Sequence, residues 1–211
     1  MKKILEIGGF ISGGILIVFG VAVIALGVNG HSTVNDSLKQ EKITGTPDMT
    51  PALIKAEATK AGLTGVSYPT CSVAGKAIDN GGNARCFAKY MRIHTLMATG
   101  GVPYALMPRY ATSDGKGTND ATKALQQNGQ PVANAARDIW VTETALTTAL
   151  NTSYMASQLS LFSIVVGLAL LLTGVGFVVL DWAALHRRKK ELAAEQQAAA
   201  VPAGAGKAAL A

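Results

Sequence analysis

The architecture of this chain follows from two long apolar segments, IGGFISGGILIVFGVAVIALGV at residues 7–28 and LSLFSIVVGLALLLTGVGFVVL at residues 159–180. Each is 22 residues long without a charged residue, and a helix needs about 20 apolar residues to cross a bilayer core. All 32 charged residues lie outside these stretches, in a chain of 211 residues that is 49% hydrophobic. This pattern excludes a cytosolic enzyme and a fibrous chain, and it predicts two transmembrane helices.

The basic residues beside the two spans predict the orientation, because basic loops resist translocation. Lys2 and Lys3 precede the first span, and a cluster at 187–190 follows the second. We therefore expect a cytoplasmic N-terminus, both termini on the same side, and an extracytoplasmic loop. The resulting segments are residues 1–6 (cytoplasmic), 7–28 (transmembrane), 29–158 (extracytoplasmic helical domain), 159–180 (transmembrane) and 181–211 (cytoplasmic basic and Ala-rich tail).

Two other interpretations of the basic residues and the first span are weaker. The loop holds 12 basic and 9 acidic residues that are interspersed, so the net charge of +6 does not indicate nucleic-acid binding. The alternative for the first span is a cleaved signal peptide. Its apolar run exceeds the 7 to 15 residues typical of such peptides, and no clear small-residue cleavage site follows it.

Small residues form a stripe along each predicted span, and such stripes let helices approach closely in lipid. The first stripe contains Gly9, Gly13, Gly20 and Gly27, and the second contains Ser160, Ser163, Gly167 and Gly174. If the spans pack as an antiparallel hairpin, the pairs are Gly13 with Gly174, Gly20 with Gly167 and Gly27 with Ser160. The alternatives are that the same stripe forms the interface of a homo-oligomer, or that the glycines reflect only the general abundance of glycine in transmembrane helices.

The loop between the spans has mainly helical signals. Thr50 and Pro51 are typical of a helix start, which predicts a helix at 52–61 and a loop at 63–83. A second helix is expected at 84–99, a short one at 120–127, and a long one at 132–180 that enters the second span. Residues 34–43 are expected to continue the first span as a stalk.

Cys71 and Cys86 are the only cysteines, and both lie in the loop. In an oxidising compartment such a pair predicts a disulfide. The closed loop is short enough that chain-entropy estimates give about 3 kcal/mol.

The sequence contains no recognisable catalytic, cofactor-binding or metal-binding motif. Of the three histidines, His186 is expected on the opposite side from His31 and His94, and non-haem iron needs two histidines and a carboxylate. The only polar cluster that we single out for ligand or partner contact is His94, Tyr104 and Arg109. Trp140 in the long helix packs in the core or contacts a partner.

Three segments resemble a group of actinobacterial two-pass membrane proteins of unknown function. They are LKQEKI at 38–43, FAKYMRIHTLMATGGVPYAL at 87–106 with its ATGG-x-x-YA motif, and LNTSYMASQLSLFSIVVG at 150–167. The resemblance implies a cell-envelope protein. The group often carries the label of an aromatic ring-opening dioxygenase, which the histidines of this chain do not support. The cysteine loop and residues 108–130 resemble the group less.

The expected fold is mainly α: a two-pass transmembrane helical hairpin with a helical, disulfide-containing extracytoplasmic domain. The expected function is that of a non-enzymatic envelope protein without a cofactor. It would contact membrane lipid and bind protein partners, as a homo-oligomer or as a subunit of a membrane complex. The alternatives are an extracytoplasmic sensor or small-ligand-binding module and, third, a metal-dependent enzyme.

Overall fold

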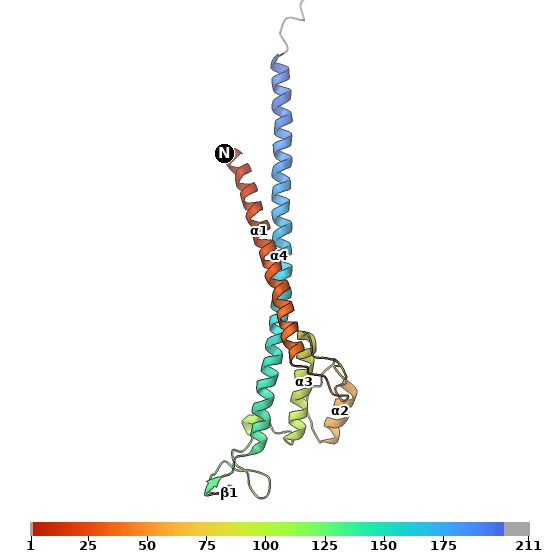
Figure 1. The fold of residues 1–211 in the computed structure, drawn as a ribbon, viewed down its shortest axis with the longest axis vertical. Helices are drawn as coiled ribbons and strands as arrows, with labels where there is room; N and C mark the ends of the chain where they lie inside the picture. The colour runs from red at the N-terminus through yellow and green to blue at the C-terminus, as the bar shows by residue number, and fades with distance from the viewer. Residues whose placement is uncertain (1, 201–211) are drawn as a thin grey trace, which may run out of the picture. The chain divides into compact units, whose positions relative to one another are not determined.

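The computed structural model describes residues 2–200, and the side chains of residues 8–197. The chain is mainly helical, as predicted (Figure 1). Its elements are α1 (Lys2–Gln40), α2 (Pro51–Lys60), α3 (Gly81–Ala98), the short 3-10 helix η1 (Tyr104–Leu106), β1 (Gln126–Gln127), β2 (Gln130–Pro131) and α4 (Ala135–Ala200).

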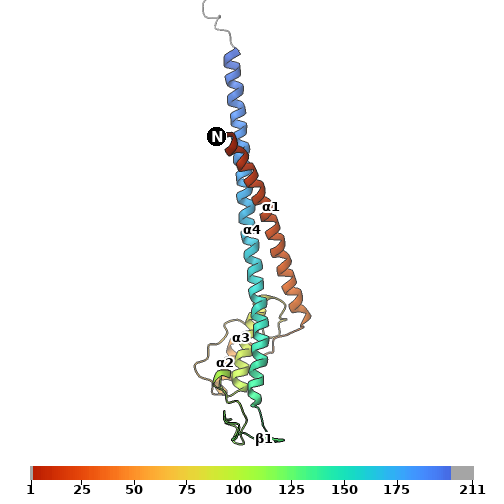
Figure 2. The same cartoon turned by 90° about the vertical axis from the view of Figure 1, so that its left-hand side faces the viewer.

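The chain divides into two compact units. The first, which we call the apolar-helix unit, comprises residues 1–28 and 162–211. The second, the globular unit, comprises residues 29–161. Each unit therefore contains one part of α1 and one part of α4, and Figure 2 shows both helices as unbroken ribbons.

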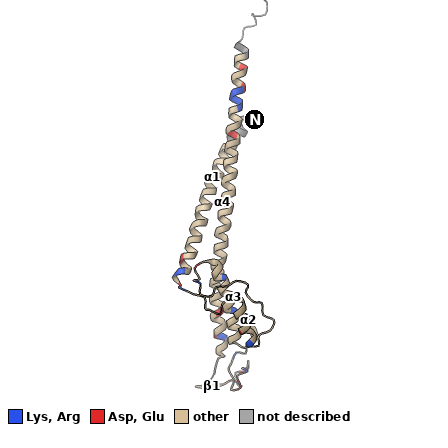
Figure 3. Ribbon diagram, turned by 90° about the vertical axis from the view of Figure 1, so that its right-hand side faces the viewer, with Lys and Arg blue, Asp and Glu red and all other residues tan. Residues whose placement is uncertain are grey.

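Two helices are long and apolar enough to cross a membrane, at Gly8–Gln40 and Ala135–Gln197. The mean hydropathy of the most apolar 18-residue stretch is 2.6 in each helix. Only 17% and 11% of these stretches is buried within the protein, whereas the core helix of a soluble protein is mostly covered. Figure 3 shows long parts of both helices without Lys, Arg, Asp or Glu.

The core of the globular unit forms around α2, α3 and the loop between them. Its largest fully buried side chains are Tyr90, Ile54, Ile78, Ile93 and Val73. The predicted disulfide is confirmed: Cys71 in the loop is bonded to Cys86 on α3, with a Cα–Cα distance of 6.1 Å. The Tyr90 hydroxyl donates a 2.6 Å hydrogen bond to the Cys71 carbonyl, so the core and the disulfide hold the same loop.

The predicted start of α2 is confirmed, whereas the predicted start of α3 is three residues late. Thr50 accepts a hydrogen bond from the Leu53 amide at 3.3 Å, with Pro51 in the first helical position. In α3, Asn80 caps the helix by accepting from the Asn83 amide at 2.9 Å. The glycines at 81 and 82, which belong to the loop predicted at 63–83, are therefore helical.

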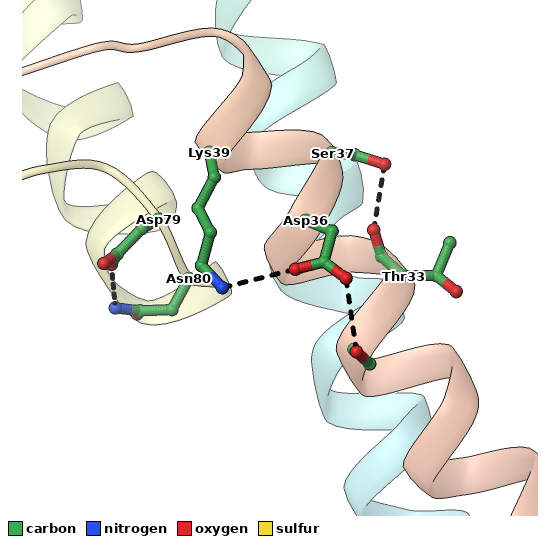
Figure 4. A network of polar contacts seen from close by, with 7 residues as sticks. Thr33, Asp36, Ser37, Lys39, Asp79 and Asn80 are labelled. Atoms are coloured by element: carbon green, nitrogen blue, oxygen red, sulfur yellow. Dashed lines mark hydrogen bonds and ion pairs between the residues drawn. The ribbon is translucent and has the colours of Figure 1, made fainter.

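The last turns of α1 carry polar side chains that bond mostly along their own helix (Figure 4). Lys39 Nζ lies 3.2 Å from Asp36 Oδ1, and Ser37 donates to the Thr33 carbonyl at 2.9 Å. The helix ends at Gln40, three residues before the predicted end of the stalk, and Lys42 has a φ of 51°. Residues with positive φ cannot continue a right-handed helix.

The short helix predicted at 120–127 is wrong. The chain instead forms a small antiparallel hairpin in which Gln126 pairs with Pro131 and Gln127 with Gln130. Asn128 and Gly129 connect the strands with φ values of 52° and 74°. This Asn-Gly pair is the preferred sequence for a two-residue hairpin turn, and it is the signal that the helical interpretation missed.

The long helix α4 begins at Ala135, three residues after the predicted start, and continues well past the predicted span. At 66 residues and 1.5 Å per residue, it is roughly 100 Å long. The described part of the Ala-rich tail is helical to Ala200. The rest of the predicted tail, residues 201–211, lies outside the described residues.

Candidate functional site

In the apolar-helix unit, two of the predicted glycine pairs lie against each other. A Cβ atom placed on Gly13 would lie 2.8 Å from the Gly174 carbonyl oxygen, and one on Gly20 would lie 2.8 Å from that of Gly167. Real Cβ atoms essentially never approach so closely, so these positions have no room for a side chain. By contrast, nothing lies within 4 Å of a Cβ on Gly14. The close approach therefore follows the stripe and not glycine content in general.

The remaining small residues of the stripes have other surroundings. Gly9 faces the carboxylate of Asp181, whose Oδ2 is buried without a hydrogen-bond partner among the described side chains. Ser160 lies in the globular unit, where its Oγ would be 2.9 Å from a Cβ on Gly30; Gly30 is one helical turn beyond Gly27, the expected partner. Gly27 is buried, and Ser163 is partly exposed.

In the globular unit, two arginines of α3 lie over aromatic rings of α4. The guanidinium of Arg85 is 4.7 Å from the ring centroid of Tyr154, and that of Arg92 is 5.3 Å from the ring of Trp140. Such cation–π contacts contribute about 0.5–2 kcal/mol each, depending on desolvation. Trp140 is 3% exposed and its Nε1 donates to the Val102 carbonyl at 3.0 Å. This tryptophan therefore packs inside the globular unit, which is the first of the two roles expected for it.

The other three residues singled out for ligand contact do not share a site. Tyr104 lies under the guanidinium of Arg137, at 4.1 Å. Arg109 is exposed and uses its backbone amide to bond Asn119 Oδ1 at 3.1 Å. His94 pairs with Asp48, with 2.6 Å between Nε2 and Oδ2. The expected polar cluster is thus replaced by three separate contacts.

His94 belongs to a different polar cluster, which includes Asp48 and Glu57. The possible metal-ligating atoms of these residues all lie within 4.8 Å of one another. Asp48 is in the turn before α2, Glu57 is on α2 and His94 is on α3. Successive members are 9 and 37 positions apart along the chain, so no short motif marks them, and His94 is the only one of the three that the sequence pointed to.

The electrostatics of this cluster affect two pKa values. Burial acts to raise the pKa of Asp48, but hydrogen bonds from the side chain of Thr46, its own backbone and His94 outweigh that effect, so the pKa is lowered. Burial raises the pKa of Tyr90, and the negative charge of Asp48 adds to this rise. Asp48 is thus a carboxylate at neutral pH, and Tyr90 remains a neutral phenol.

Two cavities in the globular unit differ in chemistry. One, of about 550 Å³, is mainly apolar and lies between the end of α1, α3 and α4. The other, of about 490 Å³, lies between the 64–69 loop and α3 and contains Lys89 and Arg92. The apolar side chains around the first cavity are Leu38, Ile43, Phe87, Met91, Leu146 and Leu150.

Comparison of the chain with protein-family models, with curated proteins and with solved structures finds no match. The interpretation of function therefore depends on the residues and contacts described above.

Proposed function

We propose that this protein is a two-pass membrane protein in which the first part of α1 and the last part of α4 form an antiparallel transmembrane hairpin. The observation that carries the proposal is that small residues are buried and large apolar residues are exposed in the apolar-helix unit. Gly13 and Gly20 are buried, whereas Phe19 and Leu172 are 62% and 68% exposed. Exposed apolar side chains around a contact of small residues are typical of helices in lipid.

The globular unit is proposed to be extracytoplasmic, with both termini in the cytoplasm. The disulfide between Cys71 and Cys86 supports an oxidising compartment for this unit. The basic cluster at 187–190 supports a cytoplasmic location for the segment after the second span.

Labelling of single cysteines in intact cells tests this topology. Ser67→Cys in the globular unit and Glu195→Cys in the tail are each made in a chain with Cys71 and Cys86 replaced by serine. A membrane-impermeant maleimide is expected to label the first variant in intact cells and the second only after lysis. Labelling of both variants in intact cells contradicts the proposed topology.

We further propose that the protein is a non-enzymatic accessory subunit whose spans and globular unit bind protein partners. The large apolar residues of α1 and α4 face away from the glycine contacts and are exposed. They can pack against lipid or against the helices of a partner. The globular unit adds exposed apolar side chains of its own, including Ile139, Val141 and Leu146 on α4.

Photo-crosslinking in cells tests this partner role. A photoreactive amino acid replaces Phe19, Leu172 or Val141 in turn, and a position on the polar part of α4, Gln196, is the matched control. A discrete crosslinked protein at one or more apolar positions, absent at Gln196, supports the proposal. Crosslinks to lipid alone at Phe19 and Leu172, with none at Val141, contradict it.

The second candidate function is binding of a small apolar ligand, and the apolar cavity favours it. Its volume of about 550 Å³ lies within the usual range for ligand pockets, roughly 300–1,000 Å³. Native mass spectrometry of protein purified in mild detergent is expected to show a retained molecule. Its loss in Ala149→Trp, which would fill the cavity, with retention in the exposed control Ala105→Trp, would assign the ligand to this cavity.

A further inference from the structure

We propose that Asp48, Glu57 and His94 form a binding site for a divalent transition-metal ion, of which Zn²⁺ is the best match. The site is independent of the proposed function, since it concerns the globular unit alone. It joins the turn before α2, the middle of α2 and the last part of α3.

The geometry of the three donors supports a metal ion. One carboxylate oxygen of Asp48, one of Glu57 and one ring nitrogen of His94 lie within 4.8 Å of one another. Zinc bonds of about 2.0–2.2 Å in a tetrahedral site place ligand atoms about 3.3 Å apart. The three atoms are at most 4.8 Å apart, and the 2.6 Å between His94 Nε2 and Asp48 Oδ2 shows that these two donors face each other.

The core fixes the backbone of all three ligands. Each ligand is next in sequence to a buried residue: Met49 after Asp48, Ala58 after Glu57 and Ile93 before His94. All three neighbours are at most 3% exposed. The ligands therefore project from the surface of one hydrophobic core, and a metal site on such a scaffold loses little conformational freedom when the ion binds.

The charge of the cluster also favours a cation. It brings two carboxylates together with one imidazole, and like charges at this distance repel each other. Among the residues whose side chains the structure describes, no lysine or arginine lies within ion-pair distance of Asp48 or Glu57. A divalent ion would neutralise the charge of both carboxylates and would be coordinated by the lone pair of the imidazole nitrogen.

The donor types select the class of metal. Mg²⁺ and Ca²⁺ prefer oxygen ligands only, and Ca²⁺ takes six to eight of them. One nitrogen and two oxygens suit Zn²⁺ and, more weakly, Mn²⁺. Three protein ligands leave a position for water in a tetrahedral site. The ion would join Glu57 of α2 to His94 of α3 and thereby stabilise the globular unit.

Isothermal titration of the full-length protein in detergent tests this site. The protein carries an affinity tag without histidine and is freed of metal with a chelator beforehand. We expect saturable binding of one Zn²⁺ per chain, weaker binding of Mn²⁺ and a rise of several degrees in the melting temperature of the globular unit on addition of Zn²⁺, because an ion that binds the folded state stabilises it.

Two variants and a control connect the binding to these residues. Glu57 is exposed, so Glu57→Gln is expected to fold normally, with an unchanged melting temperature in the absence of metal and an affinity for Zn²⁺ at least about 100-fold lower. His94→Gln should lose affinity to a similar extent. His31→Gln, which removes an exposed histidine of α1, should bind Zn²⁺ as the wild type does.

Three results would overturn the proposal. They are no saturable Zn²⁺ binding below about 1 mM, Zn²⁺ binding that Glu57→Gln leaves unchanged, and binding of Ca²⁺ without binding of Zn²⁺. Since none of the three ligands lies in the spans and no protein partner is present in the titration, the outcome is separate from that of the crosslinking experiment.

Discussion

The two units of this protein pack their helices in opposite ways. In the apolar-helix unit, backbones meet at glycines and the large apolar side chains are exposed. In the globular unit, large side chains such as Tyr90 and Ile54 fill a core, and a disulfide and arginine–aromatic pairs support it. Hydrophobic content alone therefore does not specify how helices pack. In the proposed transmembrane hairpin, lipid would cover the large side chains, and the small residues would form the contact between the helices.

The largest expected difference in stability between the two units comes from a substitution in the core of the globular unit. Tyr90→Ala should destabilise that unit by about 4 kcal/mol, because it removes a buried aromatic ring and leaves the Cys71 carbonyl without its hydrogen bond. Leu172→Ala, in the exposed apolar surface of the other unit, should cost less than about 1 kcal/mol. Urea unfolding followed by Trp140 fluorescence, in a Trp182→Phe background, measures the first effect.

Comparable losses for both variants would remove the distinction between the units. For Leu172→Ala the measurement is reversible unfolding followed by Trp182 fluorescence, in a Trp140→Phe background. The two tryptophans of the chain lie in different units, so each background reports on one unit.

The next largest effect concerns the disulfide. Replacing Cys71 and Cys86 together by serine should destabilise the globular unit by about 3 kcal/mol, since the unfolded chain loses its cross-link between positions 15 residues apart. The apolar-helix unit should keep its stability. Unfolding followed by the two tryptophans measures both. Equal destabilisation of the two units would mean that they unfold as one.

A smaller effect is expected at the glycine contacts. Gly20→Val should cost about 1–3 kcal/mol through overpacking, because its Cβ would meet the Gly167 carbonyl at 2.8 Å. Gly14→Val is the matched control, with open space around its Cβ. Electron spin resonance distances between labels at Ile15 and Val175, both exposed, should broaden in the first variant only. Identical distance distributions in both variants would argue against packing through this stripe.

The smallest effect concerns the cap of α2. Thr50→Ala should destabilise the globular unit by about 1 kcal/mol, because the Leu53 amide loses its side-chain acceptor. Thr50→Ser keeps that acceptor and should restore most of the stability. Urea unfolding followed by Trp140 fluorescence compares the three proteins, and equal stability of the alanine and serine variants would show that the cap contributes nothing.

Local signals predicted much of the fold. Thr50 and Pro51 marked the start of α2 correctly, and the two cysteines predicted their disulfide. The prediction failed where tertiary contacts decide the structure. Gly81 is helical because Asn80 caps α3. The residue is small because this first turn passes close to α4, where a Cβ on Gly81 would lie 2.8 Å from the Cβ of Ser157 and 3.0 Å from the Cα of Tyr154.

The candidate sites were less predictable than the fold. The glycines of the stripe recur at a regular spacing along the sequence, so the spacing alone predicted which of them share one face of the helix. The cluster of Asp48, Glu57 and His94 has no such spacing, because the fold of α2 onto α3 brings distant positions together. The partners of Trp140 and Tyr104 are arginines of other segments, and no pattern in the sequence indicates those pairs.

The glycine contacts also have a consequence for the synthesis of the protein. Gly20 and Gly167 are 147 positions apart, and ribosomes add about 5–20 residues per second. The glycine face of α1 is therefore synthesised about 7 to 30 seconds before the face of α4 that packs against it. During that interval this face is open to any other helix in its surroundings, including the first helix of a second copy.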